Sequence, residues 1–136
     1  MKKIVIALIS FFIAYQANAV DASKEVLQIE NAAFKDKPVF CEEDILDIKR
    51  NDFKLTDYEL MSSESGERYA LVSIKNISAG RRILREKNLV AIFSNCTSLY
   101  PQKIEQTLAG NETLTKKIYF GKNKFPIIKI ITGNEM

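Results

Sequence analysis

Short stretches of alternating apolar and polar residues dominate the chain from residue 39 onward. Residues 69–75 and 113–120 alternate in this way, whereas 89–96 and 125–132 are apolar at most positions. Alternation with a period of two is typical of a strand with one buried face, and a continuous apolar run is typical of a strand buried on both faces. The pattern therefore predicts strands in these four segments, with 89–96 at the centre of a sheet.

Weaker apolar segments at 39–41, 45–48, 53–61 and 104–108 add further short strands, and polar turn residues separate them. The basic segment 81–88 fits either a loop or a single helical turn. Six or seven short strands at this spacing, without alternating helices, predict an all-β fold, a sandwich of antiparallel strands.

The first 19 residues have the order of parts found in a bacterial-type secretory signal peptide. Lys2 and Lys3 are followed by an apolar run over 4–14, and small residues stand at Ala17 and Ala19. A membrane-spanning helix needs about 20 apolar residues, so this run is too short to be an anchor. We expect cleavage after Ala19, export to the periplasm and no membrane anchor in the product; secretion into the medium is the less favoured alternative.

The remaining 117 residues are enough for one domain with a modest core. Within 20–37, Val26, Ile29 and Ala33 have near-helical spacing, so this part is either a short N-terminal helix or a loosely held leader. We expect residues 38–136 to form a single β-sandwich domain.

Cys41 and Cys96 are the two cysteines of the chain, and both lie in its exported part. In an oxidising compartment an isolated pair forms a disulfide most simply. Closing the loop of 56 residues between them should stabilise the fold by about 4 kcal/mol in the chain-entropy model. A redox-active pair is less favoured, because catalytic dithiols usually stand close together in sequence.

The charge of the exported part is balanced in total but not in distribution. It holds 18 Lys and Arg against 17 Asp and Glu, a net charge of +1, which argues against nucleic acid as a partner. Residues 20–67 carry −7, however, and residues 68–136 carry +8. Either the two halves face each other across the fold, or the separation steers a charged partner.

The chain contains no histidine, which removes the usual general base near neutral pH. Ser-His-Asp and Cys-His nucleophile systems are thereby excluded, and so are histidine-containing zinc sites. A pair of carboxylates would suffice for glycoside hydrolysis, but nothing marks two of them as an opposed pair. The sequence therefore predicts no catalytic residues, no cofactor and no metal site.

Two charge clusters are candidate partner-binding sites, although a solvated face or a plain basic loop is the favoured interpretation. The acidic cluster stands beside Cys41, and its spacing matches no calcium loop. The basic cluster stands between two predicted strands, where arginine side chains suit carboxylate partners. The candidate residues are Glu42, Glu43, Asp44 and Asp47 in the first cluster and Arg81, Arg82 and Arg85 in the second.

The C-terminal two-thirds contains a recognisable order of turns and strands. A strand ends in Lys75-Asn76-Ile77-Ser78 and Gly80, and after an apolar strand Leu108-Ala109-Gly110-Asn111-Glu112 leads into Thr113-Leu114-Thr115 and an aromatic strand. Residues 68–132 resemble, in this order, small bacterial extracytoplasmic immunoglobulin-like domains. The resemblance implies an immunoglobulin-like sandwich and no particular activity.

Export, small size, a disulfide and separated charge together favour a non-enzymatic protein that binds and neutralises another protein. Immunity proteins against bacteriocins and inhibitors of cell-wall hydrolases are of this type. The alternative is an accessory or structural subunit of an envelope secretion or surface-fibre assembly. A carboxylate-based hydrolase is the least favoured hypothesis.

Overall fold

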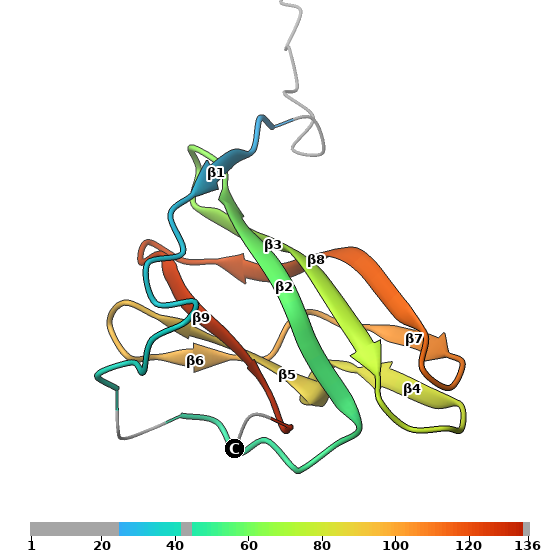
Figure 1. Ribbon diagram of the computed structural model, residues 1–136. Helices are drawn as coiled ribbons and strands as arrows, with labels where there is room; N and C mark the ends of the chain where they lie inside the picture. Colours follow the sequence, from blue (N-terminus) through green and yellow to red (C-terminus); the bar gives the residue numbers. More distant parts are fainter. Residues whose placement is uncertain (1–24, 42–44, 135–136) are drawn as a thin grey trace, which may run out of the picture.

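The chain folds into two layers of antiparallel strands, seen in Figure 1. The structure, a computed structural model, describes residues 25–41 and 45–134. The elements are β1 (Gln28–Glu30), β2 (Phe53–Ser62), β3 (Glu67–Asn76), β4 (Arg82–Arg85), the 3₁₀ turn η2 (Glu86–Asn88), β5 (Leu89–Phe93), β6 (Ser98–Leu99), β7 (Glu105–Leu108), β8 (Thr113–Lys122) and β9 (Ile127–Thr132). The predicted all-β, sandwich-like fold is confirmed.

The first layer is a four-stranded sheet in the order β1-β2-β3-β8. β2 and β3 form a long hairpin, and Gly66 at its turn has a φ of +89°, a conformation that side chains other than glycine rarely adopt. In β3 the residues Ala70, Val72 and Ile74 are buried, as their alternation predicts.

The second layer consists of the pair β4-β7 and the sheet β6-β5-β9. Only the 3₁₀ turn η2 separates β4 from β5, so the two are consecutive parts of one interrupted path through the layer. β4 pairs with β7, and β5 pairs with β9. The basic segment 81–88 is thus neither a plain loop nor a single turn, but a strand followed by a turn. All five residues of β5 are buried, which confirms a strand covered on both faces.

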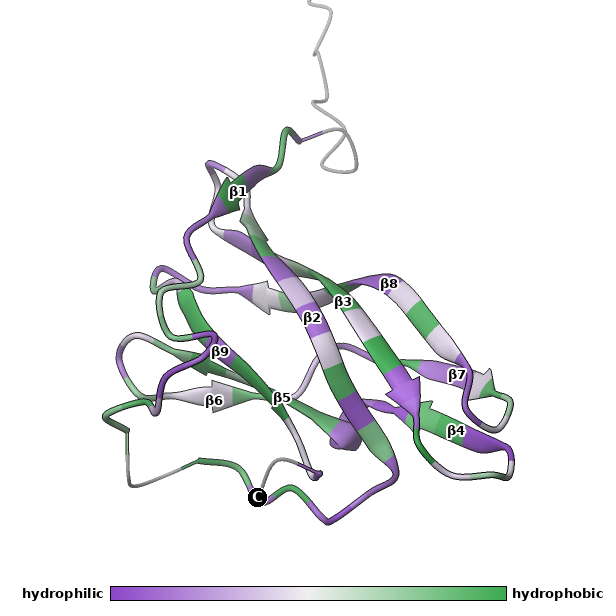
Figure 2. Cartoon of the chain, in the orientation of Figure 1, coloured by the Kyte–Doolittle hydropathy of each residue, from purple (hydrophilic) through white to green (hydrophobic). Residues whose placement is uncertain are grey.

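The main core lies between the layers and explains the alternation seen along the strands in Figure 2. Its buried side chains come from both layers, so neither sheet is covered without the other. They are Phe53, Tyr58, Leu60, Ala70, Val72, Ile74, Leu84, Leu89, Ala91, Phe93, Ile104, Leu108, Ile118, Phe120, Ile127 and Ile130.

A second apolar cluster lies on the outer face of the sheet β6-β5-β9. Residues 34–41 and 45–48, which we call the cover segment, bring Cys41 and Ile48 onto Val90, Ile92 and Ile128. This segment is not a strand, so the strands predicted at 39–41 and 45–48 are wrong. Its apolar residues are buried by packing of side chains and not by pairing of backbones.

The disulfide Cys41–Cys96 fastens the cover segment to the turn after β5, with the two Cα atoms 5.3 Å apart. The predicted bridge is therefore confirmed. Two hydrogen bonds add to it: Leu46 N–H donates to Ser98 Oγ at 2.8 Å, and the Tyr100 hydroxyl donates to the Asp47 carbonyl at 2.8 Å.

The N-terminal helix that was one of two expectations for 20–37 is not formed by the described part of this segment. Gln28–Glu30 instead pairs with Leu60–Ser62 as β1. The end of the β2–β3 hairpin offers unpaired backbone groups there, and Glu30 Oε1 accepts hydrogen bonds from Ser62 Oγ at 2.7 Å and Arg68 Nη1 at 2.6 Å. These tertiary contacts outweigh the helical spacing of the apolar residues.

The predicted signal peptide, residues 1–19, lies outside the described residues. Within 25–41 and 45–134, no helix has both the length and the apolar character that a membrane span requires.

Asn76 holds the loops together at the end of the sandwich where β3 ends. Its side chain is fully buried, and Nδ2 donates to the carbonyls of Gly80 at 2.8 Å, Ala109 at 2.9 Å and Leu108 at 3.3 Å. Its Oδ1 accepts from the Ser78 N–H at 3.0 Å and from Ser78 Oγ at 2.9 Å. One amide thus joins the β3–β4 loop to the β7–β8 turn.

Candidate functional site

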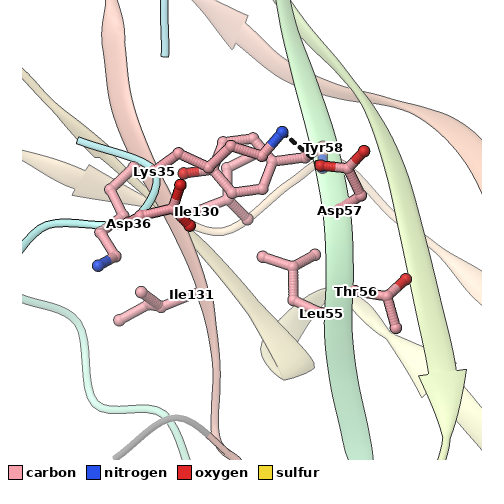
Figure 3. A pocket seen from close by; sticks show the side chains of 9 residues that line it. Lys35, Asp36, Leu55, Thr56, Asp57, Tyr58, Ile130 and Ile131 are labelled. Carbon is pink, nitrogen blue, oxygen red and sulfur yellow. Dashed lines mark hydrogen bonds and ion pairs between the residues drawn. The ribbon is translucent and has the colours of Figure 1, made fainter. Parts of the chain in front are cut away.

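A cleft of about 390 Å³ lies where an edge of each layer meets the other, between β2 and β9 (Figure 3). The two strands are neighbours in space but belong to different sheets and are not paired. The start of the cover segment forms one side of the opening. The lining residues are Lys35, Asp36, Leu55, Thr56, Asp57, Tyr58, Lys129, Ile130 and Ile131.

No strand formed by the described residues lies beside the outer edge of β9. β9 is the last strand of its sheet, and its described partner is β5. Among the described residues, no backbone group of Ile127–Thr132 bonds to a backbone group outside that pairing. The side chain of Lys129 connects β9 to the cover segment, because its Nζ donates to the Lys37 carbonyl at 2.9 Å. The outward backbone groups of an edge strand are a template for pairing with another chain.

The edge of β2 facing the cleft is protected against such pairing. β1 covers only Leu60–Ser62, and below it the ladder with β3 shifts register between Leu55 and Asp57, which leaves Thr56 as a bulge. The N–H of Tyr58 donates to Asp57 Oδ1 at 2.9 Å, so the strand caps its own backbone. Bulges and charged side chains are common means of blunting an edge.

Lys35 organises the charge at the mouth of the cleft. Its ammonium bonds to the Asp57 carboxylate, lies 3.8 Å from Glu59 Oε1 and stands 5.2 Å from the centre of the Tyr58 ring. The hydrogen bond with Asp57 raises the pKa of Lys35. The same bond, followed by that from the Tyr58 N–H, lowers the pKa of Asp57. Both groups are therefore held in their charged forms.

The charged residues that line the cleft are balanced, with the carboxylates of Asp36 and Asp57 against the ammonium groups of Lys35 and Lys129. Glu59, which lies beside Lys35 but does not line the cleft, adds one more carboxylate next to the mouth. Asp36 makes no ion pair with any other described residue.

The floor of the cleft is apolar. Ile130 and Tyr58 are 1% and 4% exposed, and Leu55 is half-buried beside them. An apolar floor with a charged mouth suits a ligand that presents an apolar group flanked by a cation. Among residues 25–41 and 45–134, no three Asp, Glu, Cys or His side chains form a group able to hold a metal ion.

The basic cluster predicted from the sequence lies on and before β4, a strand that Figure 1 shows in the other layer from β2. None of its three arginines is among the residues that line the cleft. Arg82 Nε donates to Asp52 Oδ2 at 2.7 Å, and Arg85 Nη1 donates to Glu105 Oε2 at 3.2 Å. Arg81 is exposed. Two of the three guanidinium groups are thus already paired within the molecule.

The acidic cluster lies mostly outside the described residues, which include only Asp47 of its four members. Asp47 is exposed on the cover segment and does not line the cleft. Glu42, Glu43 and Asp44 fall within the undescribed residues. The described members of the two predicted clusters therefore do not come together in the cleft.

The cleft residues gave no signal in the sequence. They come from three segments that are far apart in the chain, and each segment has the pattern of an ordinary strand or leader. Comparison of the chain with known protein families, with curated proteins and with solved structures gives no match.

Proposed function

We propose that this chain is an exported, non-enzymatic protein that binds another protein and neutralises it, in the manner of a bacteriocin immunity protein or an inhibitor of a cell-wall hydrolase. The observation that carries the proposal is the cleft between β2 and β9, which combines an open strand edge, an apolar floor and a charged mouth. The Cys41–Cys96 disulfide supports a location outside the cytoplasm, and the N-terminal pattern supports the periplasm.

The order of the strands supports an immunoglobulin-like sandwich with six of its seven positions filled. In that fold the chain passes between two sheets in a Greek key, and the last strand closes the edge of one sheet. Here β2, β3 and β8 lie in one layer, and β7, the β4–β5 path and β9 in the other. On this proposal the position of the seventh strand lies beside β9, at the cleft.

The charges in the cleft support binding over hydrolysis. A carboxylate that acts as a general acid needs a raised pKa, so that it holds a proton near neutral pH. The pKa of Asp57 is lowered by its hydrogen bond with Lys35. This carboxylate is thus held ionised in its pair with Lys35 and is not suited to donate a proton.

Affinity capture tests the proposal. Residues 20–136, oxidised and immobilised, are exposed to periplasmic extract and to culture medium of competing strains. We expect one protein to be retained and to form a soluble 1:1 complex, measured by light scattering after gel filtration, in which its own activity is lost. Recovery of large envelope assemblies alone would favour the structural-subunit alternative. Hydrolysis of peptidoglycan by the purified chain alone would contradict the non-enzymatic assignment.

A further inference from the structure

We propose that the outer edge of β9 binds an extended segment of the partner protein as an additional strand, with an apolar side chain in the cleft and a basic side chain at its mouth. The inference rests on the proposed function, because the occupant is a segment of the bound protein. It commits to a mode of binding that the proposed function leaves open.

The backbone gives the first argument. Among the described residues the outer side of β9 is unpaired, and the strand is regular from Lys129 to Thr132, beyond its own bulge at Ile128. The facing edge of β2 is bulged at Thr56 and caps the Tyr58 N–H with Asp57. An incoming strand can therefore pair with the edge of β9, whereas the edge of β2 does not offer a regular set of backbone groups. Strand addition of this kind gives affinity through main-chain hydrogen bonds and specificity through pockets for alternate side chains.

The floor of the cleft gives the second argument. Side chains of a strand point alternately to the two faces of its sheet. A strand added to β9 would thus direct every second side chain towards the side on which Ile130 is buried, where Leu55 and Tyr58 complete an apolar wall. The occupant should carry an apolar residue at that position.

The charge at the mouth gives the third argument and selects between occupants. The lining itself is balanced, so the excess carboxylate at the mouth is that of Glu59, and it calls for a lysine or arginine in the bound segment. A second copy of this chain paired through its own β9 would bring two acidic mouths together and two Lys129 side chains into proximity, and like charges so placed oppose pairing. A basic, alternating segment of another protein fits better.

The first experiment uses capped octapeptides in which valine or isoleucine alternates with lysine or threonine, in a panel of shifted registers. Binding to residues 20–136 is followed by NMR, and amide hydrogen exchange is measured in the complex. We expect slower exchange at alternate amides of residues 129–132, the regular part of β9, and unchanged exchange in β6. Failure of the whole panel to bind at about 1 mM, a concentration that detects weak peptide affinity, overturns the proposal.

N-methylation provides a matched control within the peptide. Only one alternate set of peptide amides faces β9, so methylating that set should weaken binding about fivefold for each hydrogen bond lost, and methylating the other set should have little effect. Equal tolerance of both sets would mean that the peptide is held by its side chains, and strand addition would be excluded.

Charge reversal tests the choice of occupant. The double variant Asp36→Lys/Glu59→Lys should prefer glutamate-containing peptides to lysine-containing ones by at least about tenfold, while the control Asp47→Lys, which changes a carboxylate outside the cleft, keeps the original preference. An unchanged preference in the double variant overturns the charge argument.

The outcomes for the inference and for the proposed function are separable. If a captured protein forms a 1:1 complex but leaves exchange along β9 unchanged, the proposed function stands and strand addition fails. Sedimentation shows whether the chain associates with itself, and a change in that association in Lys129→Glu shows that it passes through β9. Such self-association would assign the edge to a second copy of the chain and overturn the choice of a segment from another protein.

Discussion

The buried amide of Asn76 gives a sharp test of how the loops at one end of the sandwich are held. The substitution Asn76→Asp keeps the size of the side chain but replaces the Nδ2 donor by an oxygen. Nδ2 supplies two protons, which go chiefly to the carbonyls of Gly80 and Ala109 at 2.8 and 2.9 Å. An aspartate at this position would face both carbonyls with no proton to share.

The cost can be worked from these contacts. A lost hydrogen bond costs about 1 kcal/mol, and a buried acceptor left without a donor costs about 1–3 kcal/mol. The Ala109 carbonyl keeps the Glu112 N–H at 3.2 Å, and the Gly80 carbonyl shares the single Ser78 hydroxyl proton with the side-chain oxygen at position 76, so the unsatisfied acceptor is chiefly the introduced carboxylate oxygen. We therefore expect Asn76→Asp to lower the free energy of unfolding by about 3 kcal/mol. Burial and the facing carbonyls should raise the pKa of the introduced carboxyl, so its protonation at low pH restores one donor and the loss should shrink as the pH falls.

Urea unfolding of the oxidised protein, followed by circular dichroism, measures this loss. With a slope of about 2 kcal/mol/M, the midpoint should fall by about 1.5 M. Asn95→Asp is the matched control: Asn95 is exposed, and its Oδ1 accepts from Thr97 N–H and Oγ1 as Asn76 Oδ1 accepts from Ser78. Because aspartate keeps that oxygen, the control should change stability by less than about 0.5 kcal/mol. Equal midpoints for the two variants would refute the reasoning.

Three further predictions concern the disulfide and two titrating groups. Replacing both cysteines by serine should lower the free energy of unfolding by about 4 kcal/mol; in calorimetry or urea unfolding, a loss below about 1 kcal/mol would contradict it. Asp57→Asn should destabilise the protein most between the ordinary carboxyl pKa of 3.8 and the ordinary ammonium pKa of 10.5, because folding lowers the pKa of Asp57 and raises that of Lys35. The difference in stability between variant and wild type should shrink as the pH falls through the pKa of Asp57 in the folded protein, or rises through that of Lys35. A difference that does not depend on pH would refute the ion pair. The hydrogen bond that Tyr119 donates to Glu67 raises the pKa of Tyr119 to about 12. Ultraviolet titration should therefore find one phenol that ionises well above the ordinary pKa of 10.0, and Tyr119→Phe should remove that step.

The strands of the sandwich could be predicted because their side chains obey a local rule. In β3 every second residue is buried, and in β5 every residue is, so the sequence carries the burial pattern directly. The segment 45–48 broke the rule: Ile45, Leu46 and Ile48 are apolar because they cover a sheet, and a cover needs no backbone pairing. Apolar side chains alone do not distinguish a strand from a segment that packs across strands.

The candidate site could not be predicted, for a topological reason. The edge exists because no described strand lies on the outer side of β9, and because β1 covers the outer side of β2 at only three residues. The sequences of β2 and β9 do not show which strands lie beside them. The charge clusters were visible in the sequence, but the partners that occupy Arg82 and Arg85, Asp52 and Glu105, lie 30 and 20 residues away. Local composition gives the charge of a residue, but it does not show whether that charge is paired with another residue of the folded chain.

The cover segment is held in place partly by a disulfide, and a disulfide persists only in oxidising surroundings. Val90, Ile92 and Ile128 form an apolar outer face on the sheet, and what lies over that face is fastened by a bond that needs an oxidising environment. We expect the reduced chain to bind a hydrophobic dye that the oxidised chain excludes; equal dye binding would show that the cover holds without the bridge. The disulfide thus ties the closure of this outer face to the redox conditions around the chain.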